Sequence, residues 1–290
     1  GSLTNATEEF TGAGQPVGAW STGGNLNTAR TNIANAGTQT SALGFGGDPA
    51  PTRAFTESYN GTSWTEVGDL NTGRNTMGGS GASNTAALCF GGTISPAVTE
   101  LWNGSNWTEV NDLNTGRLYL SGAGTTTASI AVGGEVPGGN SAVTELWNGT
   151  NWTEVNDLNT ARYAGATAGI TTSALTFGGA NPRYANTESW NGTNWTEVAD
   201  LSAAKQAMGA AGTSNTSALG FGGTSPITAN TEQWNGSSWT EVANLSVARR
   251  QLGGAGTVDA ALAFGGDVPP NSTSTEEWNS SSTVIKQLTD

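Results

Sequence analysis

The chain repeats itself with a period of about 44 residues, and this repeat limits the folds open to it. All 11 tryptophans fall at two positions of the repeat. The aromatic residues at the first position are Phe10, Tyr59, Trp102, Trp147, Trp190, Trp234 and Trp278. Those at the second position are Trp20, Trp64, Trp107, Trp152, Trp195 and Trp239. A period in the 40s with strand-forming residues indicates β-propeller blades, because helical repeats of similar length have a different composition.

The pattern within each repeat predicts four β-strands. A run of small residues such as 252–257 precedes an apolar run that ends in Gly-Gly, such as 217–223. A Thr-Glu-x-aromatic segment and a Trp-Thr-Glu segment follow, with Asn-Gly between them in most copies. Asn-Gly is a strong hairpin signal because both residues accept positive φ. Small side chains suit the innermost strands, which converge at the axis, and Trp and Phe can fill the wider space between blades.

The number of repeats predicts an all-β fold, a six-bladed β-propeller of four-stranded blades. The small-residue run and Gly-Gly strand occur as a pair six times, but Thr-Glu-x-aromatic occurs seven times. We expect Trp278 to lie in the third strand of the last blade and Trp20 in the fourth, so that both termini close the ring. Thr7–Phe10 is then surplus. The whole chain, 1–290, is one domain in this interpretation, with closing segments at 1–19 and 275–290.

The order of Arg, inner strand, Gly-Gly, Thr-Glu-aromatic and Trp resembles the kelch repeat over residues 20 to 282. It is also similar to the kelch-type propeller domain of galactose oxidase. The resemblance implies the propeller fold and is nearly silent on function. The copper chemistry of that oxidase is not expected here, because the chain has no histidine and its one cysteine, Cys89, lies in a Gly-Gly strand.

Charge and composition exclude several classes of function. The net charge is −13, which argues against nucleic acid and against anionic lipid as partners. No apolar run approaches the length of a membrane span. The absence of histidine removes the usual general base and His-ligated metal sites. No convincing pair of catalytic carboxylates is evident, so we predict neither an enzyme nor a cofactor.

Six of the ten basic residues share one repeat position, at the start of the innermost strand. They are Arg30, Arg74, Arg117, Arg162, Lys205 and Arg249. A propeller can place them in a ring around one mouth of the axial channel, where they would attract a carboxylate, sulfate or uronate. The alternative is structural, since kelch-like arginines often hydrogen-bond loop carbonyls of the next blade and a repeated Asp lies nearby. The repeated Glu residues are expected on a solvated face or in cross-strand pairs with Thr.

The loops between the second and third strands differ most between repeats, and they share a face with the turns that carry the six cations. Residues on these loops and turns give one mouth a predicted aromatic and basic character. They are Tyr119, Tyr163, Tyr184, Arg53, Arg183 and Arg250. Aromatic faces and planar donors suit sugars or peptide termini. Neutral variation of surface loops is the alternative explanation.

These observations predict a non-catalytic recognition module that binds a glycan or protein ligand at one propeller face. The candidate ligand-binding residues are the six cations with Tyr119, Tyr163, Tyr184 and Arg250. The low charge and near-identical blades resemble extracellular adhesins and phage or virus structural proteins, which predicts an extracellular or virion-associated location although no signal peptide is evident. The first alternative is a scaffold domain that forms part of a larger assembly. The second is a polysaccharide-acting enzyme that uses Tyr and Arg.

Overall fold

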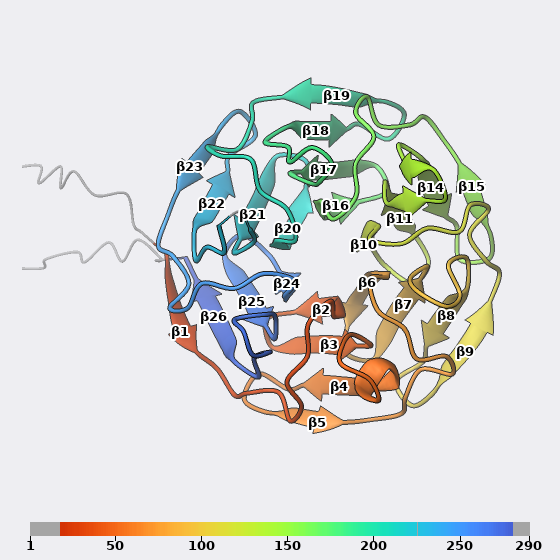
Figure 1. Ribbon diagram of the computed structural model, residues 1–290, viewed down its shortest axis with the longest axis vertical. Helices are drawn as coiled ribbons and strands as arrows, with labels where there is room; N and C mark the ends of the chain where they lie inside the picture. The colour runs from red at the N-terminus through yellow and green to blue at the C-terminus, as the bar shows by residue number, and fades with distance from the viewer. Residues whose placement is uncertain (1–17, 225, 281–290) are drawn as a thin grey trace, which may run out of the picture.

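The computed structural model describes residues 18–224 and 226–280. Six four-stranded antiparallel sheets are arranged around a central axis, as the ring of labelled strands in Figure 1 shows. In each sheet the strand nearest the axis leads into the Gly-Gly strand, and the strand that carries the second Trp position of the repeat lies at the rim. The predicted six-bladed β-propeller is therefore confirmed.

The first three blades follow the chain in order. Blade 1 contains β2 (Ala34–Thr38), β3 (Ser41–Phe45), β4 (Thr56–Tyr59) and β5 (Trp64–Glu66), with the short 3-10 helix η1 (Thr52–Ala54) before β4. Blade 2 contains β6 (Gly78–Ser83), β7 (Ala86–Phe90), β8 (Thr99–Trp102) and β9 (Trp107–Val110). Blade 3 contains β10 (Ser121–Gly124), β11 (Ser129–Val132), β14 (Thr144–Trp147) and β15 (Trp152–Glu154). Its loop adds a small hairpin of β12 (Glu135–Val136) and β13 (Gly139–Asn140).

The other three blades complete the circle. Blade 4 contains β16 (Ala166–Ile170), β17 (Ser173–Phe177), β18 (Thr187–Trp190) and β19 (Trp195–Val198). Blade 5 contains β20 (Gly209–Ser214), β21 (Ser217–Phe221), β22 (Thr231–Trp234) and β23 (Trp239–Glu241). Blade 6 contains β24 (Gly253–Gly256), β25 (Ala260–Phe264), β26 (Thr275–Asn279) and β1 (Ala19–Thr22).

Blade 6 closes the ring with a strand from each end of the chain, as expected. β1 pairs antiparallel with β26, and Trp20 lies opposite Trp278. In Figure 1 the red β1 lies beside the blue β26. The surplus segment Thr7–Phe10, and with it most of the closing segment 1–19 and the end of 275–290, lies outside the described residues.

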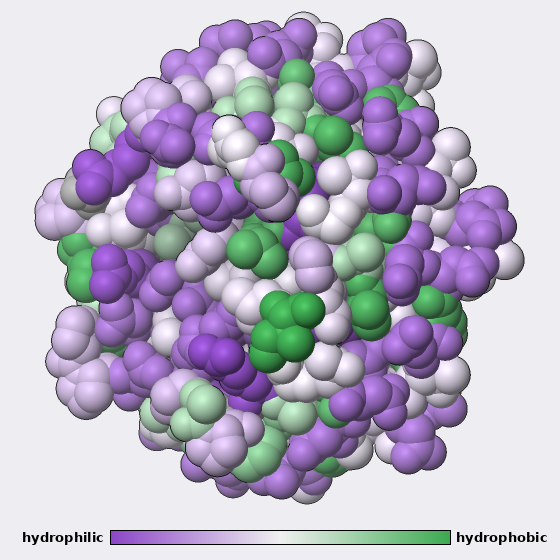
Figure 2. Space-filling view, turned by 45° about the vertical axis from the view of Figure 1, so that its right-hand side comes forward, coloured by the Kyte–Doolittle hydropathy of each residue, from purple (hydrophilic) through white to green (hydrophobic). Residues whose placement is uncertain are grey.

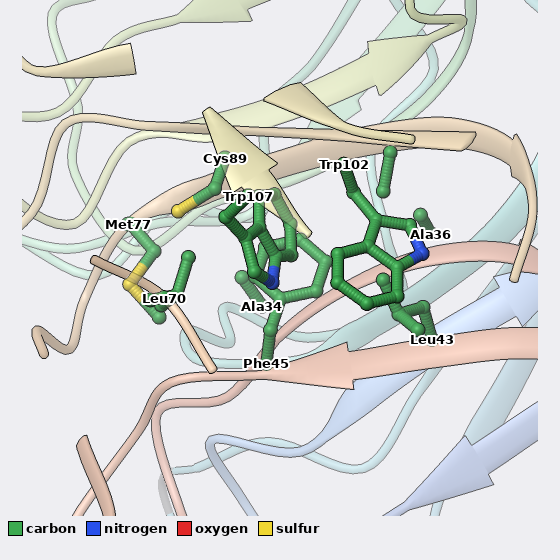
Figure 3. Packing of buried hydrophobic residues seen from close by; sticks show 10 residues of the cluster. Ala34, Ala36, Leu43, Phe45, Leu70, Met77, Cys89, Trp102 and Trp107 are labelled. Atoms are coloured by element: carbon green, nitrogen blue, oxygen red, sulfur yellow. The ribbon is translucent and has the colours of Figure 1, made fainter. Parts of the chain in front are cut away.

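The core lies between neighbouring blades. Figure 3 shows the seam of blades 1 and 2, where Phe45 and Leu43 meet Trp107, Trp102 and Met77. The rings of Phe45 and Trp107 have centroids 4.9 Å apart. The innermost strand of blade 2, β6, has to carry small residues here, because a Cβ on Gly79 would lie 2.9 Å from Phe45 Cζ. Small residues on the innermost strands thus have the steric cause that the sequence suggested.

The rim tryptophans also join each blade to the one before it. Their indole Nε1–H groups donate to the threonine hydroxyl that opens the third strand of the preceding blade. The pairs are Trp20–Thr231, Trp64–Thr275, Trp107–Thr56, Trp152–Thr99, Trp195–Thr144 and Trp239–Thr187. These bonds also join blade 6 to blade 5, through Trp20, and blade 1 to blade 6, through Trp64, so the closing blade is held like the others.

Candidate functional site

The six repeated cations are buried, with at most 5% of each residue exposed. Each forms an ion pair with the glutamate of the third strand of its own blade. The nitrogen–oxygen distances are 2.8 Å for Arg30–Glu57, 2.9 Å for Arg74–Glu100, 2.9 Å for Arg117–Glu145, 2.6 Å for Arg162–Glu188, 2.5 Å for Lys205–Glu232 and 2.9 Å for Arg249–Glu276. We call these twelve residues the cation–glutamate ring. The prediction that the cations line the mouth of the channel is wrong.

Blade 3 shows how such a pair is satisfied. Arg117 Nη1 donates to the carbonyl oxygens of Gly133 at 2.8 Å and Val143 at 2.6 Å. The second carboxylate oxygen of Glu145 accepts from the backbone N–H and the side-chain amide of Asn114, both at 2.8 Å. Burial lowers the pKa of Arg117, and the charge of Glu145 opposes this shift. The expectation that the third-strand glutamates are solvated is also wrong, because they neutralise buried cations.

The main chain of each cation joins its blade to the preceding one. Its carbonyl oxygen accepts a hydrogen bond from the second glycine of the preceding Gly-Gly pair. The six donor–acceptor pairs are Gly47–Arg74, Gly92–Arg117, Gly134–Arg162, Gly179–Lys205, Gly223–Arg249 and Gly266–Arg30. Each cation therefore stabilises its own blade through its side chain and the contact with the preceding blade through its carbonyl oxygen. The structural alternative for these residues is supported, although the side chains bind carbonyls of their own blade.

The other predicted basic residues do not make the mouth positive. Arg250 pairs with Asp267 at 2.7 Å, and Arg53 pairs with Asp48 at 2.9 Å. Arg183 is exposed on a loop of blade 4. Tyr184 covers the guanidinium of Arg162, with 5.5 Å from Cζ to the ring centroid, and does not line the mouth.

A cavity of about 370 Å³ lies at this mouth, and we call it the mouth cavity. Its lining comes mostly from the second and third residues after each buried cation. Tyr119 and Tyr163 form part of its wall, with ring centroids 5.6 Å apart and planes at 49°. Among the described residues that line it, Glu135 is the only charged one, and no lysine or arginine takes part. The remaining polar side chains are Asn32, Thr76, Gln206 and Gln251.

The backbone fixes the position of these side chains. The second residue after each cation has a left-handed φ of 50–58°, as in Tyr119, Ala164 and Ala207. Its N–H donates to the carbonyl of the equivalent residue in the preceding blade. Five such bonds run from Asn32 to Gln251, Gln251 to Ala207, Ala207 to Ala164, Ala164 to Tyr119, and Tyr119 to Thr76. Between Thr76 and Asn32, both described, no such bond forms.

Tyr119 is half-buried in this wall. Burial raises its pKa, and the charges of Glu135, Tyr163 and Asp48 act in the same direction. The phenol therefore stays protonated at neutral pH and can donate a hydrogen bond.

A second cavity of about 400 Å³, the axial cavity, lies between the six innermost strands. Its lining is mostly glycine, alanine, serine and threonine, so it offers small groups and hydroxyls instead of charges. One residue from each blade borders both cavities: Ile33, Met77, Leu120, Gly165, Met208 and Leu252.

The mouth cavity offers mostly polar, uncharged groups and aromatic rings. Aromatic faces, side-chain amides, a hydroxyl and one carboxylate converge on a cavity of ligand size. Within the described residues no group of three or more Cys, Asp or Glu side chains could hold a metal ion, and no helix could span a membrane. No protein-family model matches the chain, and no curated protein matches it.

Proposed function

We propose that this propeller is a recognition module of the kelch type that binds a neutral glycan in the mouth cavity. The observation that carries the proposal is the pair Tyr119 and Tyr163, which present aromatic surface in the same cavity as the amides of Gln206 and Gln251. Sugar rings have apolar faces and many hydroxyls, so aromatic walls with amide donors and acceptors complement them. Glycans are exposed outside the cell and on virions, where such a module would act.

A neutral ligand fits better than an anionic one. The six cations that would attract a uronate or sulfate are buried and paired, and Glu135 gives the mouth a negative charge. An anion at the mouth would meet this carboxylate on a protein of net charge −13. The proposal is one of binding without catalysis, because glycosidases commonly need two carboxyl groups and the cavity lining has one.

The scaffold alternative finds less support on the surface. The exposed large apolar residues of the described chain are Ile94, Ile170 and Val247, which come from blade 2, blade 4 and the loop after blade 5. On the face in Figure 2, green apolar residues form small separate spots among purple hydrophilic ones. A stable interface between subunits usually needs a larger continuous apolar patch.

Isothermal titration calorimetry with neutral oligosaccharides, chosen from a glycan array, tests the proposal. Tyr119→Ala is expected to weaken binding at least tenfold, and Ala164 and Ala207 already hold the same backbone conformation. Tyr184→Ala is the matched control, since this tyrosine lies outside the mouth cavity. The proposal fails if no neutral glycan binds, or if the two variants bind equally well.

A further inference from the structure

One blade lacks a side chain that the other five carry at the junction of the two cavities. The third residue after the cation is Ile33, Met77, Leu120, Met208 or Leu252 in five blades and Gly165 in blade 4. The five large side chains are at least 92% buried. Each lies over the first glycine of the Gly-Gly pair in the preceding blade. A Cβ added to Gly91 would lie 2.7 Å from Leu120 Cδ2, and a Cβ added to Gly178 would lie 2.7 Å from Met208 Cε.

The equivalent space in the seam between blades 3 and 4 is not filled in this way. A Cβ on Gly133 would lie closest to Arg162 O at 2.6 Å, Leu158 Cδ1 at 3.5 Å and Ser141 O at 3.6 Å. No atom of Gly165 is among these three nearest neighbours of the added Cβ. Gly165 borders both the mouth cavity and the axial cavity, and it comes two residues after Tyr163 in the sequence.

The backbone at Gly165 does not require glycine. Its φ lies outside the left-handed region, and the atoms nearest to an added Cβ would be Gly178 O and Phe177 O at 3.4 Å and Arg162 Cδ at 3.7 Å. These are ordinary van der Waals contacts. The local structure therefore leaves room for a Cβ at this position.

A second departure in the same seam is compensated, which sets Gly165 apart. Val132 stands where the other five blades have phenylalanine. Thr176 stands where blades 1 and 5 have Gly44 and Gly220, whose neighbours are the phenylalanine rings of the preceding blades. Thr176 is 1% exposed and hydrogen-bonded to Thr167 at 3.2 Å. The smaller Val132 is thus matched by the larger Thr176, whereas the atoms nearest to an added Cβ on Gly133 include none that takes the place of the side chain missing at Gly165.

We infer that the gap at Gly165 is a subsite for the acetamido group of an N-acetylated sugar. This inference rests on the proposed function, because the sugar ring would lie against Tyr119 and Tyr163. The methyl group would take the place of the aliphatic side chain that the other blades have. The carbonyl oxygens of Phe177 and Gly178 border the gap, and Gly178 O already accepts from Arg162 Nη1 at 3.1 Å. Because a carbonyl oxygen has two lone pairs, these atoms can still accept from the N–H of the acetamido group.

Gly165→Leu tests this inference with two measurements, and Gly165→Ala is a smaller step in the same direction. Without ligand, Gly165→Leu is expected to raise the melting temperature by about 2–4 °C, because it fills a gap and restricts the unfolded chain. In titrations, the wild-type protein should bind chitotriose at least tenfold more tightly than cellotriose. The two trisaccharides differ in the acetamido group, so Gly165→Leu should lower this ratio to about one.

The possible outcomes separate this inference from the proposed function. If both variants lower the melting temperature, there is no gap and the inference is wrong. If the ratio in Gly165→Leu equals that of the wild-type protein while Tyr119→Ala loses binding, the subsite is wrong and the mouth site stands. If neither trisaccharide binds, the acetamido assignment is overturned, and the mouth proposal then depends on the wider glycan screen.

Discussion

The cation–glutamate ring and the mouth cavity are built from adjacent residues, yet they differ in how they repeat. In blade 3 the ring residue is Arg117, and the second and third residues after it, Tyr119 and Leu120, line the mouth cavity. The ring keeps a cation in all six blades and an ion pair within each. At the two positions after the cation, the side chain changes from blade to blade, from Ala164 to Tyr119 and from Asn75 to Tyr163.

The difference follows from what each position touches. A buried charge must be paired and hydrogen-bonded, so the ring position has few permitted side chains. The mouth residues hold their neighbours through backbone N–H and C=O groups, and this contact does not depend on the side chain. Repeated residues therefore stabilise the propeller, and unrepeated residues are free to bind a ligand.

The largest effect on stability is expected from Arg117→Ala. This change leaves Glu145 buried without its cation, and breaking a buried pair on one side costs about 3–5 kcal/mol. Chemical denaturation gives the free energy of unfolding. Arg53→Ala, which breaks a pair in which the arginine side chain is 36% exposed, is the control and should cost less than about 1 kcal/mol. Equal losses in the two variants would contradict the assignment of the ring.

A second prediction concerns the seam of blades 6 and 1, where Tyr59 replaces the tryptophan of the other third strands. Tyr59 donates to Glu277 at 2.5 Å, and burial, this bond and the charge of Glu277 raise its pKa to about 12. In the unfolded chain the phenol ionises near pH 10. The raised pKa contributes stability that is fully present below about pH 10 and is lost as the pH rises through about 12.

The measurement for this seam is the free energy of unfolding between pH 9 and pH 12. In the wild-type protein it should fall across this interval, and in Tyr59→Phe it should fall less. Tyr184→Phe, on a blade 4 loop, is the matched control and should behave like the wild-type protein. Parallel curves for Tyr59→Phe and the wild-type protein would show that this contact does not stabilise the seam.

The sequence predicted the blades and their closure because these depend on local patterns. Asn-Gly turns, Gly-Gly strands and the Trp positions recur at a fixed period, and the lost Trp after Trp278 pointed to Trp20 as the last strand. The depth of the cations could not be predicted from the start of a strand. Arg117 meets Glu145 28 residues later, two strands away across the blade.

A signal for the buried pairs was nevertheless present. Every repeated cation is followed by a third-strand glutamate after 26–28 residues, which makes one pair per blade. The gap at Gly165 gave a weaker signal, since glycine is common throughout the innermost strands. It becomes visible only when its position is compared with Leu120 and Met208, whose side chains lie over the preceding blade.

Lys205→Arg is expected to raise the free energy of unfolding, by less than Arg117→Ala lowers it. Lysine in blade 5 donates to Glu232 and to the side chain of Asn230, whereas the arginines also bind the carbonyl of their first glycine. Arginine would restore the bond to Gly222 O, as Arg162 binds Gly178 O in blade 4. We expect an increase of about 1 kcal/mol in the free energy of unfolding. A loss of stability would mean that the surroundings of Lys205 are fitted to lysine.

The smallest effect on stability is expected from Tyr163→Gln, which gives blade 4 the residue that blade 5 has at Gln206. Tyr163 is half-buried, and the hydrogen bond that its carbonyl oxygen accepts from Ala180 N–H does not depend on its side chain. Denaturation should therefore show a change of less than about 1 kcal/mol, mostly from the lost contact with Tyr119. Glycan binding should nevertheless fall at least tenfold. A large loss of stability would place Tyr163 with the residues that hold the blades together, and the division between repeated and unrepeated positions would then fail at the mouth itself.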